Sequence, residues 1–348
     1  MLNKFSNWLQ RSHVKEQRRD YLIIMAIAVV LIGIIIYSYS VSFADDDGAD
    51  YGLSFSSKYA EQLGLDWQET YIYILENMPA KYLRLMTYWD EIEVADDEYD
   101  YSRIKWQLEK AAEYDKEVLL IVGRRQPRWP ECHIPSWVYN LNDSERLAAE
   151  YEMIARTISE LKDYSVIFAW QIDNEPFLSV FGECPEEKLA DYREKLTFAA
   201  DLDSRPLVVT DSGEFSLWLK AARLNPIVGV SLYRTTWNKW YGKFFYPLAP
   251  SFYQYKARLI SFFAKAEQVF ISELQLEPWA DQSLAEMPLP EQYVRFPVEQ
   301  VEENIHFARR TGLEPRYGGG AEWWYWLKTE KNNSADWDAV VRAIEDNQ

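Results

Sequence analysis

The chain has 348 residues, 48% of them hydrophobic and 16% aromatic, and its formal net charge is −18. This composition can bury a core of barrel size within one domain, and it excludes a disordered chain. The excess of acidic residues excludes nucleic acid as a partner, because a negative surface repels the phosphate backbone.

The first predicted element is a membrane helix. No charged residue occurs between Tyr21 and Ala44, and a helix of that length can span a bilayer. Five basic and two acidic residues precede it, and three aspartates follow it, so the positive-inside rule predicts a cytoplasmic N-terminus. We predict a cytoplasmic basic tail (1–20), a signal-anchor helix (21–44), an acidic spacer (45–50) and one extracytoplasmic domain (51–348). Cleavage after Ala44 is the alternative, because Ser42 and Ala44 are small enough for a signal peptidase.

Strand-like and helix-like runs alternate through the rest of the chain. Apolar runs predict eight strands, at 51–55, 82–87, 117–123, 166–172, 206–211, 227–233, 268–273 and 316–322. Runs with helical spacing of apolar residues predict helices at 101–114, 144–161, 186–200, 252–266, 297–310 and 335–346. Strands that alternate with helices in this way predict the α/β class, as a single (β/α)8 barrel.

Two glutamates occupy the ends of predicted strands. Active residues of (β/α)8 barrels lie at the carboxyl ends of the strands and in the loops that follow. The fourth strand, VIFAWQIDNEPF, ends in Gln171, Asn174 and Glu175, and the seventh, VFISELQLEPW, carries Glu273. Glycoside hydrolysis needs such a pair, because one carboxyl protonates the departing oxygen while the other stabilises the oxocarbenium-like transition state. The strand ends therefore predict a glycosidase.

The motifs WQIDNEP and ISELQLEPW resemble those of the clan A glycoside hydrolases, which include the cellulase family and several β-galactosidase families. The run YWDEIEVADDEYDYSRIKWQLEKAAEYDKEVLLIV also resembles that clan between its second and third strands, and the resemblance covers residues 51–330 approximately. It implies a retaining mechanism without cofactor, with Glu175 as general acid/base and Glu273 as nucleophile. It also implies that Asn174 binds the sugar 2-hydroxyl, that Tyr233 orients the nucleophile and that Arg84 keeps it ionised.

Tryptophans are the predicted sugar platforms, since aromatic faces stack on the apolar C–H faces of sugar rings. Of 15 tryptophans, Trp324 or Trp326 of the eighth strand is expected to form the floor of the −1 subsite, and Trp89 to wall the cleft. Anchoring of a loop is the alternative role for Trp89. We expect Gln171 to support the site.

Two departures from the clan leave the substrate open. The cellulase family usually has a histidine after strand three and another near the strand-six tyrosine, and this chain has neither. GRRQPRWPECHIPSW resembles the β-galactosidase side of the clan instead. Its three arginines, Arg124, Arg125 and Arg128, either bind an anionic sugar or form structural ion pairs, and the many acidic residues favour ion pairs. The sequence fixes neither sugar, linkage nor oligomeric state.

The two cysteines, Cys132 and Cys184, follow neighbouring strands, so an oxidising compartment favours a disulfide between them. Three scattered histidines form no zinc motif, and we predict no catalytic metal.

Two other functions are alternatives to a glycosidase for this chain. A carbohydrate-binding surface protein could use the same barrel, but it needs no desolvated carboxylate pair. An aldolase or phosphate-binding barrel is disfavoured, because no lysine ends a strand and because Gly318–Gly320 is expected within the eighth strand rather than before a helix.

Overall fold

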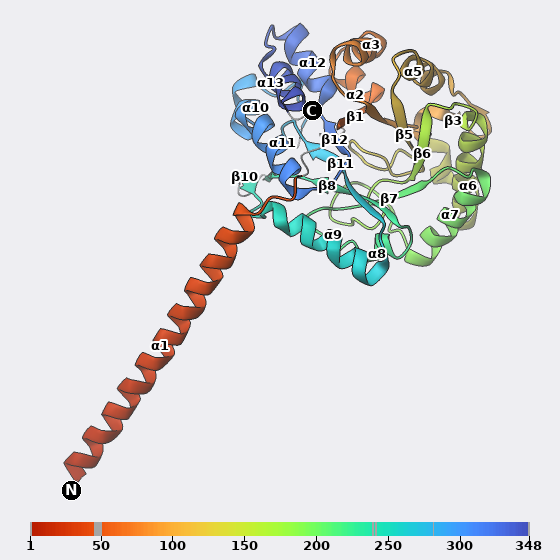
Figure 1. Ribbon diagram of the computed structural model, residues 1–348. Helices are drawn as coiled ribbons and strands as arrows, with labels where there is room; N and C mark the ends of the chain where they lie inside the picture. The colour runs from red at the N-terminus through yellow and green to blue at the C-terminus, as the bar shows by residue number, and fades with distance from the viewer. Residues whose placement is uncertain (1, 45–50, 239, 241, 281, 347–348) are drawn as a thin grey trace.

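The computed structural model describes residues 2–44, 51–238, 240, 242–280 and 282–346. A long helix, α1 (Leu2–Ser40), projects from a closed barrel of parallel strands surrounded by helices (Figure 1). The predicted acidic spacer, 45–50, lies outside the described residues.

Eight strands close the barrel in the order β1-β12-β11-β8-β7-β6-β5-β2. Their bounds are β1 Tyr51–Phe55, β2 Tyr82–Met86, β5 Glu117–Val122, β6 Ile167–Ile172, β7 Leu207–Asp211, β8 Ile227–Leu232, β11 Gln268–Gln275 and β12 Arg316–Gly319. The predicted (β/α)8 architecture is confirmed. Two short hairpins lie outside the barrel, β3 (Glu93–Ala95) with β4 (Glu98–Tyr99) and β9 (Thr235–Asn238) with β10 (Gly242–Phe245).

Helices form the outer layer of the barrel (Figure 1). They are α2 Ser57–Gln62, α3 Trp67–Asn77, α4 Trp89–Ile92, α5 Ser102–Glu113, α6 Asp143–Leu161, α7 Leu189–Leu202, α8 Leu219–Ala222, α9 Pro250–Ala264, α10 Leu289–Arg295, α11 Glu299–Thr311, α12 Ala321–Glu330 and α13 Ala335–Glu345. Local capping fixes where some begin. Asn142 and Glu145 form a capping box at the start of α6, which satisfies backbone N–H groups that a helix end leaves unpaired.

The strands are buried on both faces, as expected when helices cover a parallel sheet. Residues Val118–Val122 of β5 are fully buried. Inside the barrel, side chains from five strands form a small separate core that fills one end, consisting of Leu119, Ala169, Val208, Phe270 and Tyr317. This packing leaves the chemistry to the opposite end, where the strands finish.

The prediction for the eighth strand was wrong at its end. β12 stops at Gly319, and Gly320 adopts φ +112°, a left-handed conformation that glycine tolerates and that begins α12. Trp324 and Trp326 therefore lie on a helix. The glycines 318–320 therefore precede a helix, whereas we expected them all within a strand and disfavoured a phosphate site for that reason. The carboxylate of Glu322, fully buried in the first turn of α12, is already paired there with Arg128.

Candidate active site

Glu175 lies in a strained turn directly after β6. Its φ is +44° and that of Asp173 is +54°, conformations that non-glycine residues adopt only where neighbours enforce them. The Glu175 N–H donates to Thr210 Oγ1 at 2.8 Å, and Asp173 Oδ1 accepts from the Arg125 N–H at 3.0 Å. These bonds fix the turn so that the Glu175 side chain is buried, with 7% of the residue exposed.

Glu175 has the electrostatic environment of a general acid. Burial raises its pKa well above the usual range of glutamate, the nearby Glu273 charge raises it further, and a hydrogen bond with Ser231 lowers it. A raised pKa lets a glutamate keep its proton to higher pH than usual, which favours proton donation to a leaving group. The Glu175 Oε1 atom is buried and has no hydrogen-bond partner among the described residues.

Glu273 lies on β11 where the pairing with β8 shifts register, between Ile271 and Glu273. Two donors meet its carboxylate: Arg84 Nη1 lies 2.9 Å from Oε1, and the Tyr233 hydroxyl donates to Oε2 at 3.2 Å. Both donors stabilise the anionic form of Glu273 and fix its orientation. A carboxylate held in this way can act as a nucleophile.

Arg84 connects three strand ends beneath the pair. It is fully buried on β2, and besides Glu273 it donates to Gln171 Oε1 at 2.8 Å and to Asn174 Oδ1 at 2.7 Å. Gln171 also donates to the Asp173 carbonyl at 2.9 Å. Gln171 is therefore part of the network under the site, with its polar atoms directed at protein groups.

A third carboxyl group, which was not predicted from the sequence, lies at the site. Glu131 follows β5, is 6% exposed, and hydrogen-bonds with Asn174. Burial raises the pKa of Glu131 to about 8, with Glu273 raising it and Arg125 lowering it. One feature of the sequence could have indicated Glu131. It adjoins Cys132, whose predicted disulfide connects the loop after β5 to the loop after β6. We conclude that three carboxyl groups influence one another at the mouth.

The predicted tryptophan platforms are closed to a sugar. Trp324 is fully buried and donates to the Leu276 carbonyl at 2.7 Å, and Trp326 is 3% exposed. Trp89 is 1% exposed, and its indole donates to Glu93 Oε2 at 2.6 Å. Their faces pack in the core, so no sugar can stack on them without displacing neighbouring side chains.

Another aromatic series leads from the catalytic pair to the surface. Trp279, half-buried after β11, lies 5.4 Å from the Tyr233 ring between centroids. Phe181 lies 4.8 Å from Trp279, and the exposed Trp129 lies 5.7 Å from Phe181. Trp279 is the aromatic residue of this series nearest to Tyr233, and it can supply the stacking surface that Trp324 and Trp326 do not.

The three arginines after β5 all form ion pairs within the protein. Arg124 contacts Glu187 at 2.7 Å and Glu150 at 3.3 Å, and Arg125 lies 3.9 Å from Glu131.

Arg128 contacts Glu277 at 2.5 Å and Glu322 at 3.2 Å, and it stacks on the Tyr59 ring at 3.8 Å. Of the two roles considered for this loop, these contacts favour structural pairing over recognition of an anionic sugar.

A buried lysine occupies the one group of acidic side chains that could hold a cation in the described part of the chain. The carboxylates of Glu150, Asp173 and Glu187 lie within 4.8 Å of one another. Lys195 Nζ contacts them at 2.5, 2.8 and 3.0 Å respectively. The ammonium group takes the place of a metal ion and supports the turn that carries Glu175.

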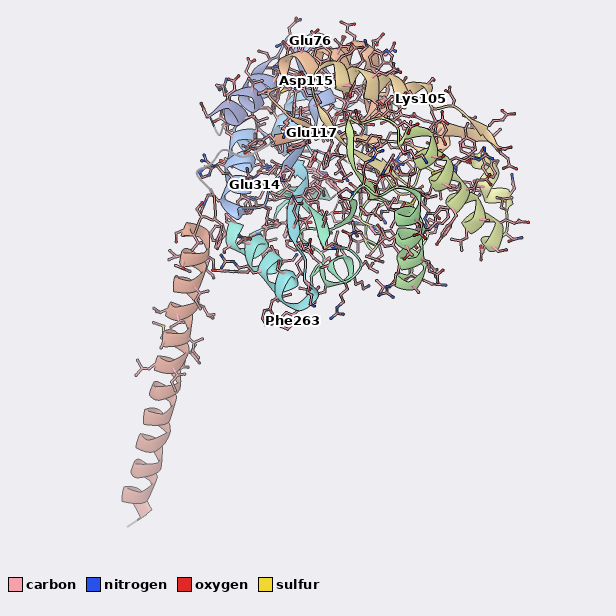
Figure 2. The ribbon with its side chains drawn as sticks, turned by 45° about the vertical axis from the view of Figure 1, so that its right-hand side comes forward. Glu76, Lys105, Asp115, Glu117, Phe263 and Glu314 are labelled. Atoms are coloured by element: carbon pink, nitrogen blue, oxygen red, sulfur yellow. A yellow bond between two sulfur atoms is a disulfide. The ribbon has the colours of Figure 1, made fainter. Side chains whose placement is uncertain are left out.

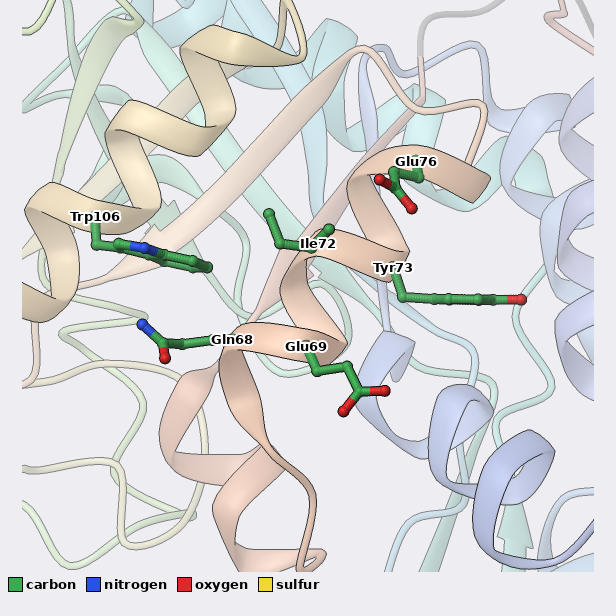
Figure 3. A pocket seen from close by; sticks show the side chains of 6 residues that line it. All are labelled: Gln68, Glu69, Ile72, Tyr73, Glu76 and Trp106. Carbon is green, nitrogen blue, oxygen red and sulfur yellow. The ribbon is translucent and has the colours of Figure 1, made fainter.

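Cys132 and Cys184 form a disulfide with 5.2 Å between their Cα atoms. The bridge connects the loops after β5 and β6, which carry Glu131 and Glu175. A surface groove of about 300 Å³ lies elsewhere, between α3 and α5, and its lining residues belong to the outer helical layer (Figure 3). We do not assign it to the catalytic chemistry.

No family model and no curated protein matches the chain. Solved structures do share its fold. The GH5_18 protein from Bifidobacterium longum subsp. infantis is 13% identical, with a TM-score of 0.62 over 86% of this chain and 79% of that one. The GH5_18 protein from Streptomyces cattleya, solved with GlcNAc, is 13% identical, with a TM-score of 0.60 over 86% and 80%.

Xylanase 10B from Thermotoga maritima is 12% identical, with a TM-score of 0.57 over 90% of this chain and 97% of that one. These neighbours are glycoside hydrolases of families 5 and 10, in clan A. At such low identity the similarity establishes the fold alone, which is the (β/α)8 barrel expected from the sequence.

Proposed function

We propose that this protein is a retaining glycoside hydrolase that cleaves O-glycosidic bonds, β-linked, in an extracytoplasmic oligosaccharide or polysaccharide. The observation that carries the proposal is the contrast between two neighbouring carboxyl groups. Glu175 is buried with a raised pKa, whereas Glu273 receives hydrogen bonds from Arg84 and Tyr233. One group is suited to donate a proton and the other to attack as an anion.

The two groups act in two steps. Glu273 attacks the anomeric carbon while Glu175 donates its proton to the glycosidic oxygen, so the leaving alcohol departs and a glycosyl ester forms. Glu175, now a carboxylate, accepts a proton from water, whose oxygen attacks the same carbon and releases Glu273. The sugar product regains its original configuration, and Glu175 regains its proton.

Asn174 is proposed to bind the sugar 2-hydroxyl, and Trp279 to stack on the sugar. Asn174 Oδ1 already accepts from Arg84, which holds its amide beside Glu131 and the catalytic pair. Trp279 flanks Tyr233 and therefore borders the nucleophile.

The apolar helix is proposed to anchor the enzyme in a membrane. Residues Tyr21–Ser40 of α1 have a mean hydropathy of 2.7, and their side chains contact little of the protein. The basic residues before the span and the acidic residues after it support a cytoplasmic N-terminus and an extracytoplasmic barrel. Such a position suits a substrate outside the cell membrane.

The test is a hydrolysis screen of the full chain in detergent against aryl glycosides and glycans, with the anomer of the first product identified by NMR. We expect a substrate whose product keeps its configuration. Glu273→Ala should lower kcat by at least about 10⁴-fold, with azide restoring turnover to the glycosyl azide of inverted configuration. Glu175→Ala should affect poor leaving groups most, and the exposed Glu76→Ala serves as control. Binding of glycans without turnover across the screen would contradict the enzyme and support a carbohydrate-binding protein.

A further inference from the structure

One outer helix of the barrel exposes an apolar face to solvent. α9 buries Tyr253, Ala257 and Ile260 against the barrel. Its opposite face carries Tyr255, Leu259, Phe262 and Phe263, which are 45%, 39%, 80% and 66% exposed and follow helical spacing. Two adjacent phenylalanines exposed to this extent on a helix need a partner, because burying them elsewhere would be favourable.

The end of the membrane helix docks beside this face. The Phe43 N–H donates to the Arg310 carbonyl at 3.0 Å, and the Ser251 hydroxyl donates to the Ser38 carbonyl at 3.0 Å. The Phe43 ring meets the Tyr255 ring edge-on at 5.9 Å. These contacts fix where α1 leaves the barrel, next to the first turns of α9.

The direction of α9 fits a surface at the end of the span. In Figure 1, α9 runs across the axis of α1 from the point where α1 meets the barrel. In Figure 2, Phe263 lies at the edge of the barrel that is turned toward α1, away from the other labelled side chains of the domain. A bilayer spanned by α1 would therefore meet the apolar face of α9.

The charge of α9 also fits a lipid surface. The helix carries neither Asp nor Glu, although the chain has 55 acidic residues against 37 basic ones. Exposed cations flank its apolar face, namely Arg258 on the helix and Lys265 at its end. A surface groove of about 510 Å³ adjoins the face and includes Arg258 and Phe262 in its lining. Apolar side chains flanked by cations are typical of helices that lie in the headgroup region.

We propose that α9 lies on the outer surface of the bilayer and inserts Leu259, Phe262 and Phe263 among the lipid headgroups. The partner is thus a lipid surface, and the inference rests on the proposed anchor α1 and not on hydrolysis. α9 belongs to the wall of the barrel, between β8 and β11. The wall faces the membrane, and the mouth with Glu175 and Glu273 stays open to substrate.

The test measures lipid contact of the full chain in nanodiscs. Both native cysteines are in the disulfide, so a cysteine introduced by Phe262→Cys takes a single environment-sensitive fluorophore. The matched control is Val94→Cys, 70% exposed on β3, far from α1 (Figure 1). Lipids carrying a quencher near the headgroup should quench the label at 262 more than the label at 94, by roughly twofold or more.

Equal quenching at the two positions, in chains that co-elute with the discs, would overturn the inference and leave the anchor standing. Failure of the full chain to co-elute would overturn the anchor and the inference together. A label at 262 shielded by a second protein chain instead of lipid would also overturn it. The variant Phe262→Asp/Phe263→Asp should abolish quenching at a label placed by Leu259→Cys, while hydrolysis of a soluble aryl glycoside stays unchanged.

Discussion

Arg84 and Glu273 lie 2.9 Å apart, Nη1 to Oε1, although they come from β2 and β11 and are separated by 189 residues in the chain. The guanidinium is fully buried, whereas the carboxylate side chain is 16% exposed. The positive charge is therefore held beneath the site and the negative charge at its surface. A substrate can reach Glu273 without meeting Arg84.

Arg84→Met should impair both stability and turnover. It removes the partner of the partly buried Glu273 carboxylate and the donors to Gln171 and Asn174, which costs roughly 3 to 5 kcal/mol of unfolding free energy. We expect kcat/KM to fall by roughly 10²-fold or more. Denaturant unfolding and steady-state kinetics measure the two effects. Arg103→Met, which breaks an exposed pair with Glu61 at 2.8 Å, should cost less than about 1 kcal/mol. Equal effects of the two variants would contradict the role of Arg84.

Tyr233→Phe removes one hydroxyl and nothing else from the site. The hydroxyl donates to Glu273 Oε2, so its loss should lower kcat by roughly 10²-fold, with a smaller change in KM. Tyr293→Phe is the control, because its hydroxyl donates at 2.7 Å to Asp336, which is remote from the catalytic pair. An unchanged kcat for Tyr233→Phe would remove this residue from the proposed machinery.

Glu131→Gln should become more stabilising as pH rises. The pKa of Glu131 is about 8 in the folded protein and close to the ordinary value of 4.5 when unfolded. Between these values the native state binds more protons than the unfolded state, so this group's contribution to stability falls as pH rises. The melting temperature of Glu131→Gln minus that of the wild type should therefore increase from pH 5 to pH 8. A difference that is independent of pH would contradict the raised pKa.

The barrel was predictable because each strand is a short apolar run bounded by polar residues. β1 has the predicted bounds, and β6 begins one residue after its predicted start. The end of the eighth strand was predicted wrongly because GGGAEWWYWLK is mostly apolar and aromatic, and such a run fits a strand as well as a buried helix. Only the left-handed φ of Gly320 separates the two structures, and a sequence does not reveal it.

The site residues could be predicted from the sequence only where they follow the rule that active residues of barrels lie at the carboxyl ends of the strands. Residues toward the carboxyl ends of strands, such as Arg84 and Glu273, meet because parallel strands finish at one edge of the barrel. Glu131 lies in a loop, and its place beside Asn174 depends on the path of that loop and on the bridge at Cys132. The roles of all these side chains in catalysis stay predictions.

Reduction of the Cys132–Cys184 bridge should destabilise the barrel and slow turnover. The bridge closes a segment of 52 residues, so its loss releases roughly 4 kcal/mol of chain entropy in the unfolded state. It also frees the loop that holds Glu131. We expect a lower melting temperature and a lower kcat/KM with dithiothreitol, measured beside the variant Cys132→Ser/Cys184→Ser, which should not respond to the reductant. An unaffected melting temperature in the wild type would contradict the structural role of the bridge.

Lys195→Met should show how much the folded protein's stability depends on one ammonium group within the buried cluster of acidic side chains. Without Lys195, the carboxylates of Glu150, Asp173 and Glu187 face one another in the interior with Arg124 as the remaining cation. Unpaired buried charge of this kind costs roughly 3 to 5 kcal/mol.

The same substitution predicts a pH dependence with a definite sign. Burial raises the pKa of Glu187, Asp173 and Glu150 raise it further, and Lys195 lowers it, so removing Lys195 leaves the folded pKa of Glu187 still further above its unfolded value. The native variant therefore binds more protons than its unfolded state and loses stability as pH rises. Its deficit relative to the wild type should be largest above neutral pH and smallest near pH 4, measured by thermal unfolding. Lys105 lies on the surface of the barrel (Figure 2). Lys105→Met, which removes an exposed pair with Glu160, should cost less than about 1 kcal/mol at either pH. Because Asp173 also supports the turn of Glu175, Lys195→Met should lower kcat as well, and the Lys105 variant should not. A pH-independent deficit would mean that Lys195 contributes packing and not charge.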